Sequence, residues 1–181
     1  MALPATLHRV NLTLSDVDRG VYEQLELRLA RHPSESARYL LTRLLAYALS
    51  YEPGSAFSKG GLSDADEPPV SIWDMTGARL AWVDVGGPSA ERLHKASKAT
   101  PRVLLYTHLT LEQLSRQLGD LTAIHRAETI CVWHLDPQLL STLEPHLSRS
   151  FDLELVRSDG RLYITVNGQV IESALEQHTL G

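Results

Sequence analysis

The chain has 181 residues, of which 43% are hydrophobic, and its formal net charge is −5 at pH 7. This size predicts one domain, residues 1–181, with a sizeable core, and the negative charge argues against a general nucleic-acid coat protein. The single cysteine, Cys131, excludes an internal disulfide, and no apolar run approaches the roughly 18 residues that span a bilayer. Since the N-terminal residues also lack a signal-peptide pattern, we expect a cytoplasmic protein without membrane contact.

The first part of the chain predicts a hairpin, a helix and a long loop. Alternating apolar residues predict two antiparallel strands, 6–15 and 21–32, with one solvated face. A helix is expected over 33–51, because a proline and a serine open the segment and leucines recur at helical spacing. The loop that follows, 52–69, with a short strand expected near Phe57, is long enough to suggest a function. It carries three acids: Asp64, Asp66 and Glu67.

Strands and helices alternate through the middle of the chain. The expected strands are 70–73, 79–85, 103–107 and 130–134. The expected helices are 89–99, 111–118 and 137–147. This alternation implies parallel strands, whereas two Asp-Gly and Asn-Gly turns after residue 150 predict hairpins. The sequence therefore predicts an α/β protein with a mixed β-sheet flanked by helices and with antiparallel hairpins at both termini.

Several common kinds of site are missing from the sequence. No two of the eight histidines lie within four residues of each other, and the ligand spacings of a closed zinc site are absent. Neither a GxxxxGK[ST] loop nor a GxGxxG loop is present, so no nucleotide site is expected. No haem is expected either.

Asp84 is the most informative acid, because it stands near the carboxyl end of an apolar strand. Burying a carboxylate there is costly unless it is paired or bound to a metal. One interpretation is an ion pair with Arg92 or Lys95 on the next helix. The other is a magnesium site in which Asp66 or Glu67 supplies a second oxygen, because Mg²⁺ takes carboxylates, carbonyls and waters.

Positive charge gathers in two segments of this acidic chain. One segment carries Arg28, Arg31, Arg38 and Arg43 against a single acid, Glu35. The other carries Arg92, Lys95, Lys98 and Arg102 with no acid from 92 to 102. Two such segments could hold a phosphate backbone locally, and the alternative is that both are solvated faces.

Four segments together resemble the YaeQ family of small bacterial proteins: RHPSES at 31–36, LLAYA at 44–48, DEPP at 66–69 and WVDVGGPSAERLHKA at 82–96. The resemblance extends nearly from end to end. It implies a restriction-endonuclease-like core, similar to the PD-(D/E)XK nucleases. In that core a helix with an acid, a strand with an acid, a strand with (D/E)xK and a second helix follow one another.

The resemblance also implies roles for individual acids. Glu35 matches the acid of the first helix. Asp66 or Glu67 matches the acid of the first strand motif, and Asp84 matches the acid of the second.

The sequence departs from the nuclease pattern at two positions. Position 69 is Pro69, so the PD dipeptide is absent, and Gly86 stands where the lysine of the second motif is expected. We therefore hypothesise that Lys95, on the following helix, takes over the role of the catalytic lysine.

The leading hypothesis is a metal-dependent nuclease acting on nucleic-acid phosphodiesters. Its catalytic residues would be Glu35, Asp84 and Lys95. Its Mg²⁺ ligands would be Asp84 with Asp66 or Glu67, and its substrate contacts Arg31, Arg38, Arg92 and Lys98. The alternative is a non-catalytic module that binds nucleic acid or protein with the same fold. A third possibility is a structural protein in which Asp84 only pairs with a cation. The oligomeric state stays open.

Overall fold

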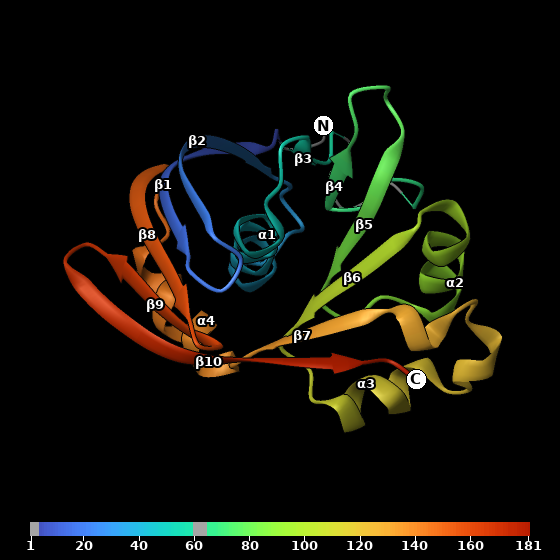
Figure 1. The fold of residues 1–181 in the computed structure, drawn as a ribbon. Coiled ribbons are helices and arrows are strands. Elements are labelled where there is room, and N and C mark those ends of the chain that lie inside the picture. Colours follow the sequence, from blue (N-terminus) through green and yellow to red (C-terminus); the bar gives the residue numbers. More distant parts are fainter. Residues whose placement is uncertain (1–3, 60–64) are drawn as a thin grey trace.

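Figure 1 shows the computed structural model of the protein, which describes residues 4–59 and 65–181. Within these residues ten strands form one mixed β-sheet in the order β2-β1-β8-β9-β10-β7-β6-β5-β4-β3. The strands are β1 (Thr6–Asp16), β2 (Val21–Arg31), β3 (Ser55–Phe57), β4 (Val70–Trp73), β5 (Arg79–Val85), β6 (Arg102–Thr107), β7 (Cys131–Leu135), β8 (Ser150–Ser158), β9 (Arg161–Val166) and β10 (Gln169–Thr179). The helices are α1 (Ala37–Ser50), α2 (Ala90–Ala99), α3 (Leu111–Leu118) and α4 (Pro137–Leu143).

The sheet is strongly curved and almost closes around α1 (Figure 1). The long strand β10 connects its two halves, because residues 169–174 pair with β9 and residues 175–179 pair with β7. The N-terminal hairpin joins the C-terminal strands through a parallel pairing of β1 with β8. All residues of α1 from 40 to 50 are buried as a result.

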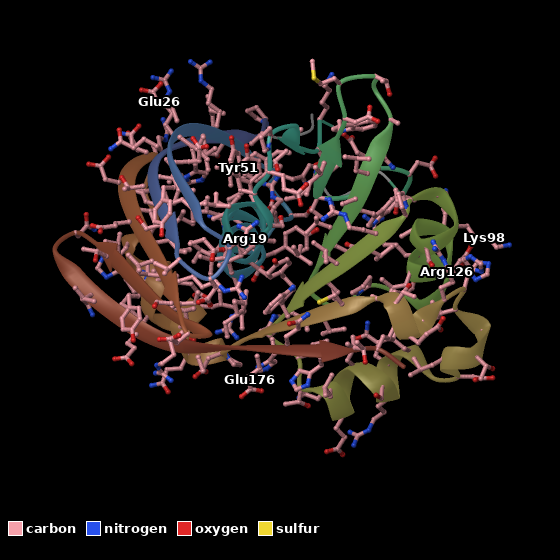
Figure 2. The ribbon with its side chains drawn as sticks, in the orientation of Figure 1. Arg19, Glu26, Tyr51, Lys98, Arg126 and Glu176 are labelled. Atoms are coloured by element: carbon pink, nitrogen blue, oxygen red, sulfur yellow. The ribbon has the colours of Figure 1, made fainter. Side chains whose placement is uncertain are left out.

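Two hydrophobic clusters of the described residues lie on opposite faces of β5, β6 and β7. The larger cluster packs α1 and α4 against the inner face of the sheet and includes Leu45 and Val83. The smaller cluster lies beneath α2 and α3 and includes Trp82, Leu93 and Leu114. Trp82 and Val83 divide between the clusters because successive strand residues point to opposite faces. Figure 2 shows side chains filling the space between α1 and the surrounding strands.

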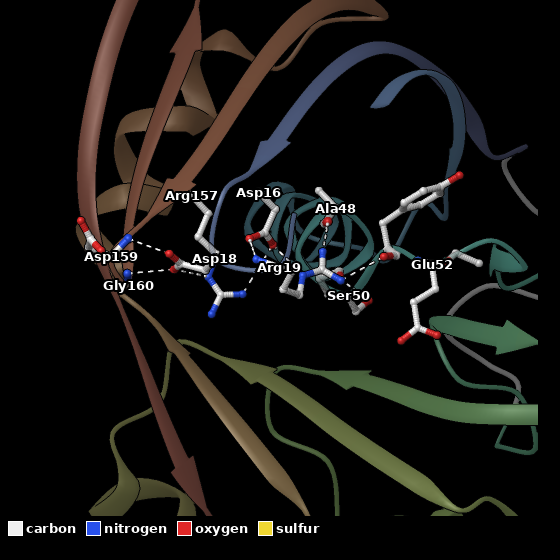
Figure 3. Close-up of polar contacts among 12 residues, drawn as sticks. Asp16, Asp18, Arg19, Ala48, Ser50, Glu52, Arg157, Asp159 and Gly160 are labelled. Carbon is white, nitrogen blue, oxygen red and sulfur yellow. Dashed lines mark hydrogen bonds and ion pairs between the residues drawn. The ribbon is translucent and has the colours of Figure 1, made fainter. Parts of the chain in front are cut away.

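A charged network fastens the β1–β2 hairpin to the end of α1 and to β8 (Figure 3). The fully buried Asp16 accepts a 2.6 Å hydrogen bond from Nε of Arg19 and lies 3.5 Å from Nη1 of Arg157. Arg19 also donates to the carbonyl oxygens of Ala48 at 3.4 Å and Tyr51 at 3.0 Å. A cation at this position binds carbonyl oxygens at the end of the helix and complements the helix dipole.

The predicted class is confirmed in its main features. The sheet is mixed and flanked by helices, β1 and β2 form an antiparallel hairpin, and β8, β9 and β10 form two more. Asp159 and Asn167 have φ angles of 51° and 49°, and the glycines after them have 71° and 75°. Positive φ at both central residues is what a two-residue type I′ hairpin requires, which is why these pairs mark the turns.

Two helix boundaries differ from expectation. α1 begins at Ala37 rather than at residue 33, because Ser36 caps it by accepting a 3.0 Å hydrogen bond from the backbone N–H of Tyr39. α4 ends at Leu143 rather than at 147, and a 3₁₀ turn containing Pro145 follows, since proline cannot continue the α-helical hydrogen bonding.

The long loop expected over 52–69 is partly ordered by β3, which pairs with β4. Asp64 lies outside the described residues.

No helix in 4–59 or 65–181 is long and apolar enough to cross a bilayer.

Candidate active site

A small polar pocket lies where the N-terminal end of α1 meets the segment before β4 and the first turn of α2. Its lining includes Glu35, Tyr39, Arg43, Glu67 and Arg92. The pocket has a volume of about 10 Å³, close to the least that one water molecule needs. Four of these five side chains are ionisable acids or arginines, so the pocket gathers opposite charges in a confined space.

Asp84 is buried on β5, with 2% of its surface exposed. Its Oδ2 accepts hydrogen bonds from Nε of Arg92 at 2.7 Å and from Nε1 of Trp82 at 3.1 Å. Its Oδ1 accepts from the backbone N–H of Val85 at 3.1 Å. Trp82 reaches the carboxylate because it lies two residues earlier on the same face of the strand. The ion-pair interpretation of Asp84 is therefore confirmed, with Arg92 as the cation.

Arg92 connects β5 to the segment that precedes β4. Its Nη2 donates to the carbonyl oxygen of Glu67 at 3.2 Å, and its Nη1 donates to that of Ala65 at 3.4 Å. The guanidinium carbon lies 5.3 Å from the centre of the Trp82 ring, within cation–π range. One carboxylate and two carbonyl oxygens thus converge on a single positive charge.

Glu35 is buried just before α1, with 3% of its surface exposed. Its Oε1 lies 3.0 Å from Nη2 of Arg43, and its Oε2 accepts a 3.2 Å hydrogen bond from the backbone N–H of His32. Burial raises the pKa of the Glu35 carboxyl above its ordinary value, and the charge of Arg43 offsets part of this rise. The acid is therefore easier to protonate than an exposed glutamate.

Tyr39 lines the pocket beside Glu35 and lies close enough to both buried acids to feel their charge. The pKa of Tyr39 is raised to about 12. Burial of the phenol is the largest cause, followed by the negative charge of Asp84, with a smaller contribution from Glu35. Both acids act on the same phenol, so they border one region of the molecule. At neutral pH the phenol keeps its proton and can donate a hydrogen bond.

Lys95 pairs with Asp66 on the surface instead of with Asp84. The side chains are 53% and 75% exposed, so this pair contributes little to stability. Lys95 lies one helical turn beyond Arg92 on α2, and the Arg92 side chain occupies the approach to Asp84. Its catalytic role stays a prediction.

The family model described as YaeQ protein matches residues 1–175. The chain belongs to the YaeQ family. It is 30% identical over 167 residues to the "Uncharacterized protein YaeQ" of Escherichia coli strain K12, and the match covers 91% of each chain. The family assignment made from the sequence is thereby confirmed.

Two crystal structures of YaeQ proteins share this fold. The protein from Pseudomonas syringae is 32% identical, with a TM-score of 0.89 and coverage of 98% of both chains. The protein from Xanthomonas axonopodis pv. citri is 30% identical, with a TM-score of 0.86 and coverage of 98% of this chain and 99% of the other. The curved sheet described above is therefore an architecture that YaeQ proteins have in common.

In this YaeQ family member the predicted site residues other than the surface pair Lys95–Asp66 fall into two groups. Glu35, Glu67 and Arg92 line the pocket, with Asp84 bonded to Arg92 behind it, and Arg31 donates to the Glu35 carbonyl oxygen at 3.0 Å.

The second group lies away from the pocket. Arg38 binds Glu144 at 3.3 Å and Ser141 at 2.7 Å, beside α4. Lys98 is exposed on the outer side of α2, where Figure 2 labels it.

Sequence reasoning missed three residues of the site: Tyr39, Arg43 and Trp82. Two of them, Arg43 and Trp82, carried a detectable signal. Arg43 is an arginine among the leucines of an apolar helix, where a buried charge requires an acid partner. Trp82 precedes Asp84 by two positions on a strand, so both side chains share a face.

Within 4–59 and 65–181, no three histidine, cysteine or acidic side chains form a group that could hold a metal ion. The oxygens that surround Arg92 are nevertheless of the kind that Mg²⁺ prefers, a carboxylate and backbone carbonyls. These oxygen atoms are of a type that can coordinate a hard cation. In this structure the same atoms accept hydrogen bonds from the Arg92 guanidinium.

Proposed function

We propose that this protein is a Mg²⁺-dependent nuclease whose reaction centre is the pocket formed by α1, β5 and the segment before β4. The observation that carries the proposal is the convergence of the Asp84 carboxylate and the Glu67 carbonyl oxygen on one cation, at 2.7 and 3.2 Å from the Arg92 guanidinium. Carboxylate and carbonyl oxygens are also the ligands that Mg²⁺ takes, so these groups could contribute to a divalent-ion site.

The order of the elements supports a PD-(D/E)XK-like core. α1, β3, β4, β5, α2 and β6 follow one another, with β4 and β5 antiparallel and β5 and β6 parallel. Glu35 precedes the helix, Glu67 precedes the second strand, and Asp84 ends the third. The order of the three acids along the chain supports the proposal, although Glu35 lies two residues before α1 and not on the helix to which the resemblance assigns it.

In the proposed reaction Asp84 and Asp66 or Glu67 would hold the ion, and Arg92 would contact the scissile phosphate. When bound there, a Mg²⁺ ion would supply Lewis-acid chemistry to the phosphate and to the attacking water. Glu35 has a pKa raised by burial, so it is suited to accept a proton. Lys95 and Lys98 extend positive charge along α2 for the substrate backbone.

A non-catalytic module that binds nucleic acid or protein is the second candidate. The Asp84–Arg92 pair favours it, because a buried carboxylate that already accepts from a guanidinium and an indole N–H has no need of a metal. In that case the guanidinium takes the place of the ion permanently.

Metal titration and cleavage assays distinguish the two. Calorimetry should show Mg²⁺ or Mn²⁺ binding to the wild type and none to Asp84→Asn, which should also lose cleavage of labelled DNA or RNA by at least about 100-fold. Arg92→Gln should bind the ion more tightly, since its competitor is gone, yet cleave more slowly. Arg116→Gln is the matched control, because Arg116 forms an exposed pair with Glu112 on α3.

Equal titration of the wild type and Asp84→Asn contradicts the metal site. Salt-dependent binding of nucleic acid without cleavage in any divalent ion supports the non-catalytic module instead.

A further inference from the structure

β2 forms one edge of the sheet. The pairing of β1 with its two neighbours shows which backbone N–H and C=O groups of β2 point towards β1 and which point out of the sheet. The backbone N–H of Arg9 on β1 donates to Arg149, towards β8. The odd-numbered residues of β1 therefore face β8, and the even-numbered ones bond β2. Each even-numbered residue of β1 is paired with an odd-numbered residue of β2, as Val10 is with Leu27. The even-numbered residues of β2 consequently direct their N–H and C=O groups out of the sheet.

A second contact supports this direction. The carbonyl oxygen of Ala30 accepts a 2.8 Å hydrogen bond from Arg43 rather than from β1. In the described part of the chain, the outward backbone groups of Tyr22, Gln24, Glu26 and Arg28 have no such partner. They form a row of donors and acceptors along the open edge.

This edge carries charged side chains but lacks the other features by which soluble proteins usually prevent strand pairing. β2 is eleven residues long, contains neither proline nor lysine, and keeps an unbroken register with β1. Edge strands are commonly short, bulged, or protected by lysine or proline. An edge of this kind accepts another strand through its backbone groups.

The side chains of β2 identify the partner, because the strand is complementary to itself. With Leu27 opposite Leu27 of an antiparallel second copy, each Glu26 faces the other copy's Arg28. Leu25 then faces Leu29, and Glu23 at one end faces Arg31 at the other. Opposite residues lie on the same face of a sheet, so these are direct cross-strand pairs.

No neighbouring register is comparable. A shift by two residues in either direction places Glu26 opposite Glu26, or Arg28 opposite Arg28, and like charges directly opposite are destabilising. A shift by one residue would place the apolar side chains of one copy on the same face of the sheet as the polar side chains of the other. Charge therefore selects one alignment.

Glu26 and Arg28 are available for these contacts. Both are exposed, and neither takes part in an ion pair among residues 4–59 and 65–181. Figure 2 shows Glu26 at the outer boundary of the molecule, pointing away from it. We propose that β2 pairs antiparallel with β2 of a second copy of this chain, which makes a homodimer with one continuous sheet.

Charge reversal tests the pairing in the full-length protein. Sedimentation should show a dimer for the wild type. Glu26→Arg and Arg28→Glu should each weaken dimerisation by about tenfold or more, because each variant turns two attractive pairs into repulsive ones. The combined variant E26R/R28E should restore the dimer, since the same pairs form with their charges exchanged. Glu154→Arg, on the same outer face of β8, is the control and should remain dimeric.

A proline variant tests the backbone contribution. Glu26→Pro removes one outward N–H but no hydrogen bond to β1, so the monomer should stay folded while the dimer is lost. The thermal midpoint of each variant confirms folding. A wild type that is monomeric at its highest soluble concentration overturns the proposal. So does a dimer that survives both single reversals, because its interface must then lie elsewhere.

Discussion

Buried charges at the site occur in pairs, and Glu35 with Arg43 is the most enclosed pair. Their side chains are 1% and 3% exposed and 3.0 Å apart. Arg43 also donates to the carbonyl oxygen of Ala30 and lies 5.7 Å from the centre of the Phe57 ring. This pair therefore joins α1 to β2 and β3, and it fixes the acid that borders the pocket.

Replacing one partner of this pair should be costly. Arg43→Met leaves a buried carboxylate without its cation, and the expected loss is about 3–5 kcal/mol of the free energy of unfolding. The loss should shrink as the pH is lowered, because burial raises the pKa of Glu35 and a protonated carboxyl needs no counter-charge. Urea denaturation at several pH values measures both effects.

The double variant Glu35→Gln with Arg43→Met is the control, and it should be much closer to the wild type than Arg43→Met alone. A single variant within about 1 kcal/mol of the wild type at neutral pH would contradict this assignment.

Among the elements, the connection from α1 to β3 depends on a glycine. Gly54 has a φ of 98°, and a Cβ placed on it would lie 2.0 Å from the carbonyl oxygen of Trp73. Its own carbonyl oxygen accepts a 3.0 Å hydrogen bond from the N–H of Trp73. The close approach of these backbones allows β3 to pair with β4 immediately after the helix ends.

Gly54→Ala should be strongly destabilising for two reasons, a strained φ and a clash with backbone. Gly77→Ala separates them, because Gly77 has a φ of 86° but nothing within 4 Å of its added Cβ. We expect the control to lose about 1–2 kcal/mol from backbone strain alone and Gly54→Ala to lose distinctly more. Thermal denaturation compares the two, and equal losses would show that the contact with Trp73 relaxes without cost.

For the whole molecule, the curved sheet connects the two hydrophobic clusters. β10 pairs with β9 at one end and with β7 at the other, and β5 contributes Val83 to one cluster and Trp82 to the other. Because the two clusters share strands, unfolding of the strands that cover one cluster would also expose the other cluster to solvent. The architecture therefore predicts one cooperative folding unit.

Tryptophans report on each cluster separately. Trp82 belongs to the smaller cluster, and Trp133 packs against the larger. Variants that retain only one of them, with the others replaced by phenylalanine, should each show fluorescence and circular dichroism transitions at the same denaturant concentration. Two separate midpoints within one variant would mean that the halves of the sheet unfold independently.

The sequence alone was sufficient for features that depend on neighbouring residues. Alternation predicted the strands of the N-terminal hairpin, leucine spacing predicted α1, and the Asp-Gly and Asn-Gly pairs predicted the turns at 159 and 167. Local steric limits on φ and the periodicity of apolar residues act over a few positions, so they are legible without the fold. The four motif segments likewise identified the family.

Only the tertiary structure decided contacts between distant segments. The sequence left Arg92 and Lys95 as equal partners for Asp84, and the placement of α2 against β5 selected Arg92. It did not predict the Arg43 partner of Glu35 or the parallel pairing of β1 with β8, which brings Asn11 opposite Asp152. Such contacts depend on how separate elements pack, and burial then determines which of several possible charge pairs forms, because an unpaired buried charge is costly.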